Sequence, residues 1–192
     1  MAKTFVEPSP FLLPIPAVLV TCRDRAGKTN VLTVSWTGVA CSDPPMITLG
    51  IRPSRHSHGI IKSTGECVVN IPKADSVATV DRSGGISGRG GDKLAELGLK
   101  TAPASKVKAP LLVDCPLNLE CQVRQVVPLG AHDLFILEVV ATQVDEGIVD
   151  ESGRLKLDAL NPLGYCPTDN SYVSLATIVG TYGYTHRDEV ER

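Results

Sequence analysis

A short polar run after an apolar segment holds the residue types best suited to bind an anion. It follows Met46–Ile51 and comprises Arg52, Ser54, Arg55, His56 and Ser57. An arginine guanidinium can bind two phosphate oxygens at once, and serine hydroxyls with exposed amides complete an anion pocket. Residue type alone fits a solvated basic loop better. Two features favour a ligand site instead. The run directly follows an apolar strand, and binding loops are commonly held by such a rigid scaffold. A second loop, rich in Ser, Gly and Arg, precedes Lys93 and could close over a ligand.

The segment Asn30–Trp36 is a predicted strand that contains small hydroxyl side chains and a tryptophan. Together with the basic run, this surface suits a flat, polar-edged ring that carries a phosphate. Familiar phosphate motifs do not explain it. Gly27-Lys28-Thr29 lacks the P-loop glycine five residues earlier, where Cys22 stands, and a β-like segment follows it. The Gly84–Gly91 loop lacks the Rossmann pattern G-x-G-x-x-G, so a nicotinamide donor would have to bind by another surface.

The composition bounds the class of protein. At 192 residues with 43% hydrophobic content, we expect one domain over residues 1–192, with its core at about 10–185. The net charge is −2, and the sequence has no basic stripe that could neutralise nucleic-acid phosphates. We therefore expect no nucleic-acid partner. The apolar run Phe11–Val20 is short, contains Pro14 and Pro16 and has no signal-peptide cleavage pattern. We therefore expect a cytoplasmic protein without a membrane partner.

The pattern of apolar and turn residues predicts a mainly β protein. We expect strands at Ile15–Thr21, Asn30–Trp36, Met46–Ile51, Glu66–Ile71, Leu117–Val127 and Leu134–Val144. Apolar and polar residues alternate in Leu117–Val127, so we expect this strand to have one wet face, which carries Asn118, Glu120, Gln122 and Arg124. The more continuously apolar Leu134–Val144 should be buried on both faces.

Short helices and loops fill the connections between these strands. We expect a short helix or turn at His58–Thr64, which ends at Gly65, and helices at Ser76–Asp81 and Asp92–Gly98, each of which begins with an N-cap residue. Gly27 should adopt a positive φ in the first turn, the prolines of Cys41–Pro45 should interrupt any ladder, and Ser83–Gly91 should be a loop. Because long amphipathic helices are absent, a closed antiparallel barrel with a few short helices is the best match.

Other chemistry-bearing residues give no clear motif. The six cysteines are Cys22, Cys41, Cys67, Cys115, Cys121 and Cys166, without a C-x-x-C pair. We interpret them as reduced, mostly buried thiols; an iron–sulfur cluster is the alternative, if the fold gathers distant cysteines. His56 and His58 have no carboxylate or further histidine near them in sequence, so we predict no metal site. No G-x-S-x-G motif supports a serine hydrolase.

A set of short stretches occurs in the order typical of one known family. These are Pro16–Thr21, Asn30–Trp36, Asp43–Pro45, Ile51–Ser57, Glu66–Pro72, Ser87–Lys93, Lys108–Pro110, Leu117–Cys121, His132–Val139 and Ile178–Gly183. Each stretch is weak alone, but together they span most of the chain in family order. On these stretches the chain resembles the flavin reductase-like family, and most closely its flavoredoxin-type branch.

The resemblance implies an FMN-binding split β-barrel, antiparallel and of Greek-key type, that forms a homodimer with FMN near its interface. In such proteins the flavin ring lies along the strand that here holds Asn30, Thr33, Val34, Ser35 and Trp36. The phosphate lies by the loop that here holds Arg52, Pro53, Ser54, His56 and Ser57. The stretch with Ser87, Gly88, Arg89 and Lys93 helps to enclose the cofactor, and the residue matching His132 lies near the nicotinamide. Trp36 either packs against the ring or sits in the core.

The resemblance also implies an activity. The expected function is that of an FMN-binding oxidoreductase, which passes electrons from NADH or NADPH through bound FMN to flavin or a protein acceptor. Hydride transfer itself needs no acid–base residue, because the cofactor carries the chemistry. The alternative is a flavoredoxin-type FMN electron carrier that serves a redox protein partner without useful NAD(P)H turnover. A third possibility is a non-redox barrel that binds another planar cofactor, such as haem.

Overall fold

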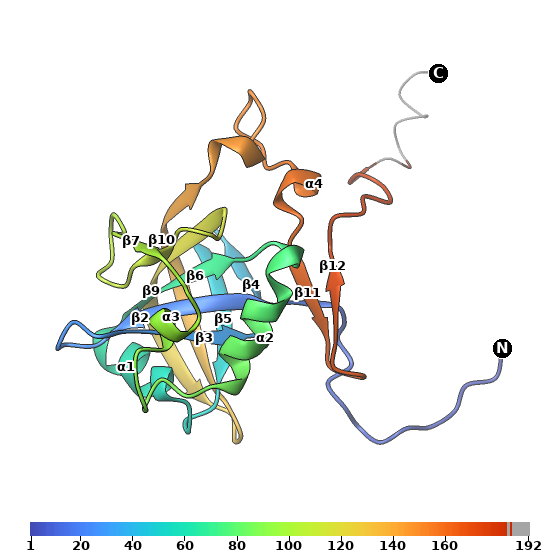
Figure 1. Cartoon of the computed structure of the whole chain (residues 1–192). Helices are drawn as coiled ribbons and strands as arrows, with labels where there is room; N and C mark the ends of the chain where they lie inside the picture. The colour runs from blue at the N-terminus through green and yellow to red at the C-terminus, as the bar shows by residue number, and fades with distance from the viewer. Residues whose placement is uncertain (184, 186–192) are drawn as a thin grey trace.

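The computed structural model describes residues 1–183 and 185, and seven of its strands form one antiparallel sheet (Figure 1). The predicted domain of residues 1–192 therefore includes some residues outside the described part. The strand order is β3-β2-β6-β9-β10-β5-β4. These strands are β2 (Val18–Arg23), β3 (Thr29–Val34), β4 (Thr37–Ser42), β5 (Pro45–Ile51), β6 (Glu66–Ile71), β9 (Leu117–Pro128) and β10 (Asp133–Val144). The mainly β, antiparallel fold is confirmed, and crossovers place β6 beside β2 and β5 beside β10.

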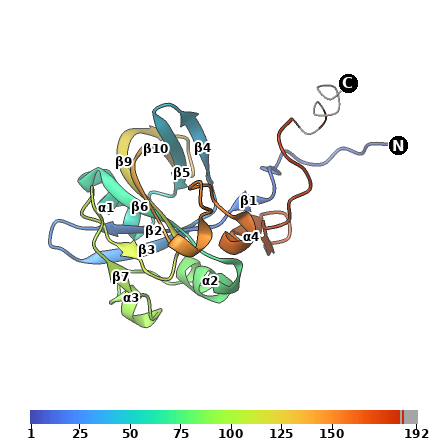
Figure 2. The same cartoon turned by 90° about the horizontal axis from the view of Figure 1, so that it is seen from above.

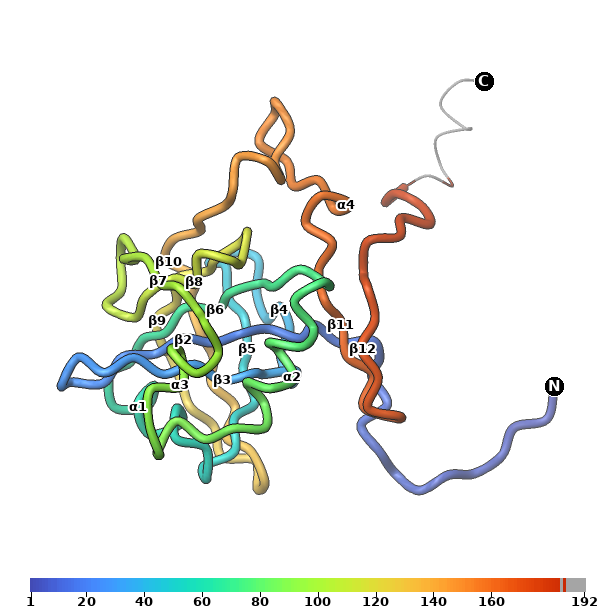
Figure 3. The backbone as a smooth tube through the Cα atoms, in the orientation of Figure 1, coloured from blue at the N-terminus to red at the C-terminus, as the bar shows by residue number. Residues whose placement is uncertain are grey.

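The remaining elements flank this sheet. A separate sheet contains β1 (Ile15–Pro16), β11 (Leu163–Cys166) and β12 (Ser171–Ser174), and β7 (Thr101–Ala102) pairs with β8 (Leu111–Leu112). The helices are α1 (His56–Thr64), α2 (Val77–Gly85), α3 (Lys93–Glu96) and α4 (Leu157–Leu160), with 3₁₀ turns at Ala74–Ser76 and Glu146–Ile148. The segment before β1 extends away from the barrel on the side of the β11–β12 hairpin (Figure 3).

The large sheet curls around a hydrophobic core. Val20, Leu49 and Phe135 come from three of its strands, belong to one buried cluster and are 0% exposed. Ile61 of α1 joins the same cluster, so this helix is packed against the barrel interior. A second cluster packs α2, through Val80, and α3 against the outer face of β2 and β3. Figure 2 shows these two helices outside the barrel wall, where they border the site described below.

Several local predictions are confirmed by the structure. Gly27 turns between β2 and β3 with φ 88°, and Gly65 ends α1 with φ 75°. β6 has the predicted bounds Glu66–Ile71. Asp92 caps α3, because its Oδ1 accepts a hydrogen bond from the Ala95 amide at 3.1 Å. Turn glycines and N-caps act within a few residues, which is why sequence alone locates them well.

The region around Trp36 differs from the prediction. β3 ends at Val34, so the predicted strand Asn30–Trp36 is two residues too long, and the chain then forms the unpredicted strand β4. The prolines of Cys41–Pro45 do not prevent a hairpin, since Ser42 lies opposite Pro45 in the β4–β5 ladder. A proline at the first position of a strand costs little because its missing N–H lies where the ladder begins.

The glycine-rich segment also differs from the prediction. α2 continues to Gly85, so Ser83–Gly85 is helical rather than part of a loop. Burial of Val80 against the barrel holds the helix together despite its two terminal glycines. Ser76 precedes α2 as predicted, but its side chain does not cap the helix; its Oγ donates to Asp75 Oδ1 instead.

The faces of the two long strands differ in part from the prediction: on β9, Gln122 and Arg124 lie on the predicted wet face and are partly or fully exposed. Asn118 and Glu120 lie on the predicted wet face of β9 but are buried. Asn118 Nδ2 donates to Asn70 Oδ1 at 2.8 Å, and Glu120 accepts hydrogen bonds from the segment after β7, including the Ser105 amide. β10 buries only one face, through side chains such as Phe135, and the other face is partly exposed. Polar residues are buried here because local hydrogen bonds satisfy them.

We expect Glu120→Gln to destabilise the fold by about 2 kcal/mol, since the amide cannot accept every hydrogen bond that the carboxylate accepts. Burial opposes ionisation, but hydrogen bonds from Ser105, Gln143 and Lys106 outweigh it and lower the pKa of Glu120 to about 2. This stabilisation is present above the ordinary carboxyl pKa and is lost as the pH falls towards the folded value. Urea unfolding at about pH 7 and about pH 3 should therefore give a smaller difference from the wild type in acid; a constant difference would contradict the charge-based reason.

The cysteines are six free thiols, of which Cys22, Cys67, Cys115 and Cys121 are buried. Burial is also the main reason that the pKa of Cys115 is raised to about 12. Within residues 1–183 and 185, no group of three His, Cys, Asp or Glu side chains is placed to hold a metal ion. In the same part of the chain, no helix is both long and apolar enough to cross a bilayer.

Candidate functional site

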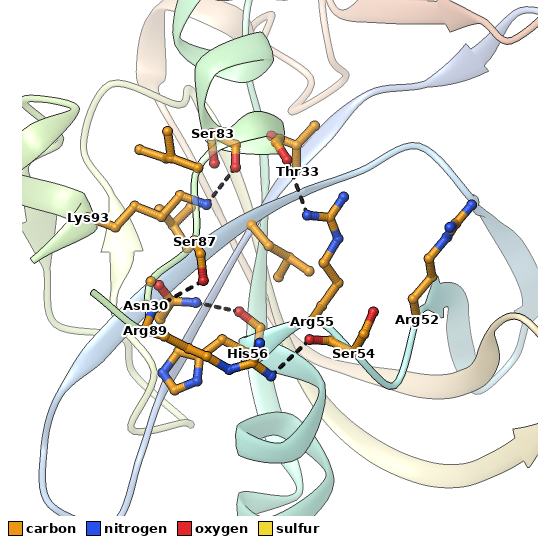
Figure 4. A pocket seen from close by; sticks show the side chains of 16 residues that line it. Asn30, Thr33, Arg52, Ser54, Arg55, His56, Ser83, Ser87, Arg89 and Lys93 are labelled. Carbon is orange, nitrogen blue, oxygen red and sulfur yellow. Dashed lines mark hydrogen bonds between the residues drawn. The ribbon is translucent and has the colours of Figure 1, made fainter. Parts of the chain in front are cut away.

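Two cavities meet where β3, the β5–α1 loop, α2 and the α2–α3 loop converge, and Figure 4 shows the first of them. Their volumes are about 260 Å³ and about 390 Å³. Residues that line both are Leu32, Thr33, Arg52, Arg55 and Gly84, so the two cavities form one continuous site. β3 is an edge strand whose only described neighbour in the sheet is β2. An edge strand keeps backbone N–H and C=O groups free on its outer side.

The structure brings together almost all residues that the sequence singled out. The first cavity is lined by Asn30, Thr33, Arg52, Ser54, His56, Ser57, Ser87, Gly88, Arg89 and Lys93. The second is lined by Val34, Ser35, Trp36 and His132. Pro53 lines neither cavity. It lies in a turn closed by a hydrogen bond from the Arg55 amide to the Arg52 carbonyl, at the position where proline is favoured, and so shapes the loop.

The first cavity is rich in positive charge and has no carboxylate among its lining residues. Lys93 is only 4% exposed and its Nζ donates to the Ser83 carbonyl. Burial lowers the pKa of Lys93 to about 8, and the charge of Arg55 acts in the same direction. Figure 4 shows Lys93 and Arg89 on one side of the cavity and Arg52 apart from them. A buried cation without a carboxylate partner favours an anionic ligand.

Hydrogen bonds hold the walls of the first cavity together. Asn30 Nδ2 on β3 donates to Ser57 Oγ at the start of α1 over 2.6 Å. The α2–α3 loop is joined to the β5–α1 loop because the Arg89 guanidinium donates to the Ser54 carbonyl at 2.9 Å. Gly88 lies against Asn30 so closely that a Cβ there would collide with the side-chain amide. A larger residue at position 88 would therefore have to displace the Asn30 amide.

Ser83 is a site residue that the sequence did not single out. It is 1% exposed and lines the first cavity, and its Oγ has no hydrogen-bond partner among the described residues. A buried hydroxyl without a partner is unfavourable unless a ligand supplies one. Ser83 was placed within a glycine-rich loop, so no sequence signal indicated that a helix end would aim its backbone and side chain at this cavity.

Two aromatic rings form one wall of the second cavity. Trp36 and His132 are stacked, with ring centroids 5.8 Å apart and an angle of 7° between the rings. Trp36 is 42% exposed, so it borders the cavity and is not a core residue. Gly50 permits this position, since its Cβ would lie 3.0 Å from the Trp36 Cβ. Arg52 Nε donates to His132 Nε2 at 3.4 Å. Burial and the Arg52 charge lower the pKa of His132, so its imidazole is neutral near physiological pH.

Two tyrosines that the sequence reasoning missed complete the second cavity. Tyr165 and Tyr172 are directly opposite in the β11–β12 hairpin, with ring centroids 5.4 Å apart. Tyr172 donates to Asp81 of α2 at 3.2 Å, and burial followed by this carboxylate raises its pKa to about 12. The turn residue Asn170, with φ 58°, was the available signal for this hairpin.

Comparison with known proteins places this geometry in a family. The sequence matches the model described as flavin reductase like domain over residues 11–174. An uncharacterised protein of Archaeoglobus fulgidus is 32% identical over 140 residues, which cover 73% of this chain and 78% of that protein. A Streptomyces pristinaespiralis protein named NADH:riboflavin 5'-phosphate oxidoreductase is 29% identical over 124 residues, 65% of this chain and 68% of that protein.

The solved structures agree with this assignment. The structure of flavoredoxin from Desulfovibrio vulgaris (Miyazaki F) superposes with a TM-score of 0.90 at 26% identity, over 97% of this chain and 100% of that chain. The fold is thus the split β-barrel that the sequence predicts. With a family match that spans both cavities and most of the chain, this protein belongs to the flavin reductase-like family.

Proposed function

We propose that this protein binds FMN and acts as an oxidoreductase, passing electrons from NADH or NADPH through FMN to flavin or a protein acceptor. The observation that carries the proposal is the first cavity, which is lined by arginines and by no carboxylate. It also holds the buried Lys93 and the Ser83 hydroxyl, which has no hydrogen-bond partner within the described residues. Family membership supports the proposal, as does the printed name of the Streptomyces relative.

The residues of the first cavity fit a phosphate monoester. Such a group carries about two negative charges near neutral pH, which Lys93 and Arg55 would neutralise. Ser57 and Ser83 offer hydroxyl donors at the same place. The amino end of α1 also borders the cavity, has no acidic residue in its first turn and receives no side-chain cap. Free amides at the start of a helix favour an anion.

The second cavity fits the flavin ring. The free edge of β3 would present backbone groups to the polar edge of the ring. Trp36 and His132 on one side, and Tyr165 and Tyr172 on another, supply flat aromatic surfaces. Aromatic rings favour stacked or edge-to-face contacts with one another. The phosphate cavity and the ring cavity adjoin, as the two ends of FMN require.

When bound, FMN supplies the redox chemistry; the residues of this chain bind it, orient it and shape the approach of the donor. Arg52, at the junction of the cavities, adds a positive charge that favours an anionic donor such as NADH or NADPH. His132 is neutral and held between Trp36 and Arg52. It can therefore offer a fixed surface to a nicotinamide ring without adding a charge there.

We expect Gly88→Ala to weaken FMN binding by about tenfold, because its methyl group must displace the Asn30 amide from Ser57. Fluorescence titration with FMN measures this change. Gly90→Ala in the same loop is the matched control, since its Cβ would meet nothing within 4 Å. Equal affinities of the two variants would contradict the role of the Gly88–Asn30 contact.

A specific observation favours an FMN electron carrier as the second candidate function. The flavoredoxin structure matches over 97% of this chain, and a carrier would use the same two cavities with a redox protein as its partner. Anaerobic mixing of the FMN-loaded protein with NADH and then NADPH separates the two. Rapid bleaching of the flavin absorption by either donor supports the reductase. Flavin that stays oxidised with both donors, but is bleached by dithionite, contradicts the reductase and supports the carrier.

We further propose a homodimer. Phe11 and Leu12 in the segment before β1 are 53% and 81% exposed. Leu12 also lines an apolar cavity of about 360 Å³ beside Trp36 and His132. A second copy that covers this surface would remove apolar area from water. Light scattering after size exclusion should give twice the chain mass; a monomer at micromolar concentration would contradict the proposal.

A further inference from the structure

A buried hydrogen-bonded pair joins α1 to β10. His58 Nε2 and Asp133 Oδ2 are 2.9 Å apart, and the residues are 7% and 8% exposed. Each is adjacent in sequence to a residue of the site: His58 follows Ser57, which borders the first cavity, and Asp133 follows His132, which borders the second. The pair itself lines neither cavity.

The position of Asp133 in the sheet explains what the pair fixes. Asp133 begins β10 and lies opposite Ile51, the last residue of β5, in the antiparallel ladder. The loop Arg52–Arg55 leaves the sheet at this point and ends where α1 begins, with His58 in the first turn of the helix. The loop is therefore attached at both ends to Asp133, by the strand ladder at its start and by His58 at its end.

Neighbouring side chains hold the His58–Asp133 pair in a single geometry. The ring of Phe135 meets the His58 ring edge-on, with centroids 5.2 Å apart and an angle of 82°, which orients the imidazole towards Asp133. Lys62 Nζ is a distant second partner at 4.0 Å and is 58% exposed. A buried carboxylate needs a hydrogen-bonding partner, and His58 is the close one. The pair thus determines where α1 starts relative to β10.

We propose that Asp133, acting through His58, is a positioning residue that sets the phosphate-binding loop relative to the ring cavity, so that one ligand engages both cavities together. This inference rests on the proposed binding of FMN. Asp133 lines neither cavity and so would not touch the ligand. Its effect is to hold Ser57 and the start of α1 in register with His132, and its loss should remove the contribution of the phosphate to binding while the contribution of the ring persists.

The test compares FMN with riboflavin, which has the same ring but no phosphate. For the wild type and each variant, fluorescence titration gives the ratio of the two dissociation constants. We expect Asp133→Ala to lower this preference for FMN at least about tenfold while riboflavin affinity stays within about twofold. Asp133→Asn should instead retain the preference for FMN, because the amide oxygen of asparagine can accept the hydrogen bond from His58 Nε2.

A matched control and a second variant keep the test decisive. Glu138→Ala removes the carboxylate of the exposed ion pair with Arg124 Nε on the same hairpin, 2.6 Å apart, and should leave the preference unchanged. If Asp133→Ala does not fold, His58→Ala removes the pair from the other side and should give the same loss. Equal weakening of FMN and riboflavin, or no loss of preference, would overturn the inference. A wild type that binds neither flavin would instead contradict the proposed function itself.

Discussion

Lys93→Met should lower the affinity for FMN about 100-fold, because it removes a buried charge-assisted hydrogen-bond donor from the phosphate cavity. Lys93 is 4% exposed, and no residue that lines this cavity carries a compensating carboxylate. Methionine keeps much of the length and apolar character of the side chain, so the fold should be retained. Fluorescence titration with FMN measures the effect. Lys100→Met, which alters an exposed lysine outside both cavities, is the matched control.

The same lysine predicts a pH dependence with a definite sign. The pKa of Lys93 is lowered to about 8, whereas a bound phosphate would raise it by favouring the charged form. FMN affinity should therefore be constant below about pH 8 until the phosphate itself is protonated near pH 6, and should fall as the pH rises above about 8. Lys93→Met should lack the alkaline fall. A wild-type affinity that is unchanged between about pH 7 and about pH 10 would contradict the assignment of Lys93 to the phosphate.

His132→Ala should slow the reduction of bound FMN by NADH or NADPH at least about tenfold, a loss of about 1.4 kcal/mol of transition-state stabilisation. The reason is that the imidazole stacks on Trp36 and accepts a hydrogen bond from Arg52, so its removal opens the wall that a nicotinamide would contact. FMN affinity should change less than in Lys93→Met, because His132 lines only the ring cavity and its loss leaves the residues of the phosphate cavity in place. Stopped-flow absorbance under anaerobic conditions separates the two quantities.

His132→Phe tests which property of the side chain matters. Phenylalanine keeps the stack on Trp36 but cannot accept a hydrogen bond from Arg52. Recovery of the rate by His132→Phe would assign the effect to stacking, and a rate as slow as that of His132→Ala would assign it to the polar contact. Reduction at the wild-type rate in both variants would remove His132 from the donor site.

Much of the fold could be predicted from sequence because its signals are local. Gly27, Gly65 and Asp92 mark turns and caps with their own conformational preferences, and the structure confirms them. The burial of Asn118 and Glu120 could not be predicted, because their partners lie elsewhere in the chain: Asn70 for the first and the segment at Ser105 for the second. Alternation in a strand distinguishes its polar face from its apolar face. A polar face can still be buried when groups distant in sequence form hydrogen bonds with its side chains.

The candidate site was predictable where resemblance or residue type gave a signal. Residues of Arg52–Ser57 and of Ser87–Lys93 line one cavity, although 29 residues lie between the two stretches in sequence. Ser83 was missed because the glycines that follow it suggest a loop, whereas packing of Val80 extends the helix. Tyr165 and Tyr172 were missed because their strands are four residues long and belong to a separate sheet. Such short strands contain too few residues to show a clear alternation of apolar and polar side chains.

The most direct test of FMN binding is the visible absorption spectrum of the purified protein, followed by FMN titration after the bound flavin has been removed. The two adjoining cavities predict a yellow protein that, once stripped, takes up FMN saturably at one molecule per chain and quenches or shifts its fluorescence. They also predict tighter binding of FMN than of riboflavin, since the buried Lys93 and Ser83 engage only the phosphate. A colourless protein that takes up no added FMN would contradict FMN binding, whatever its fold.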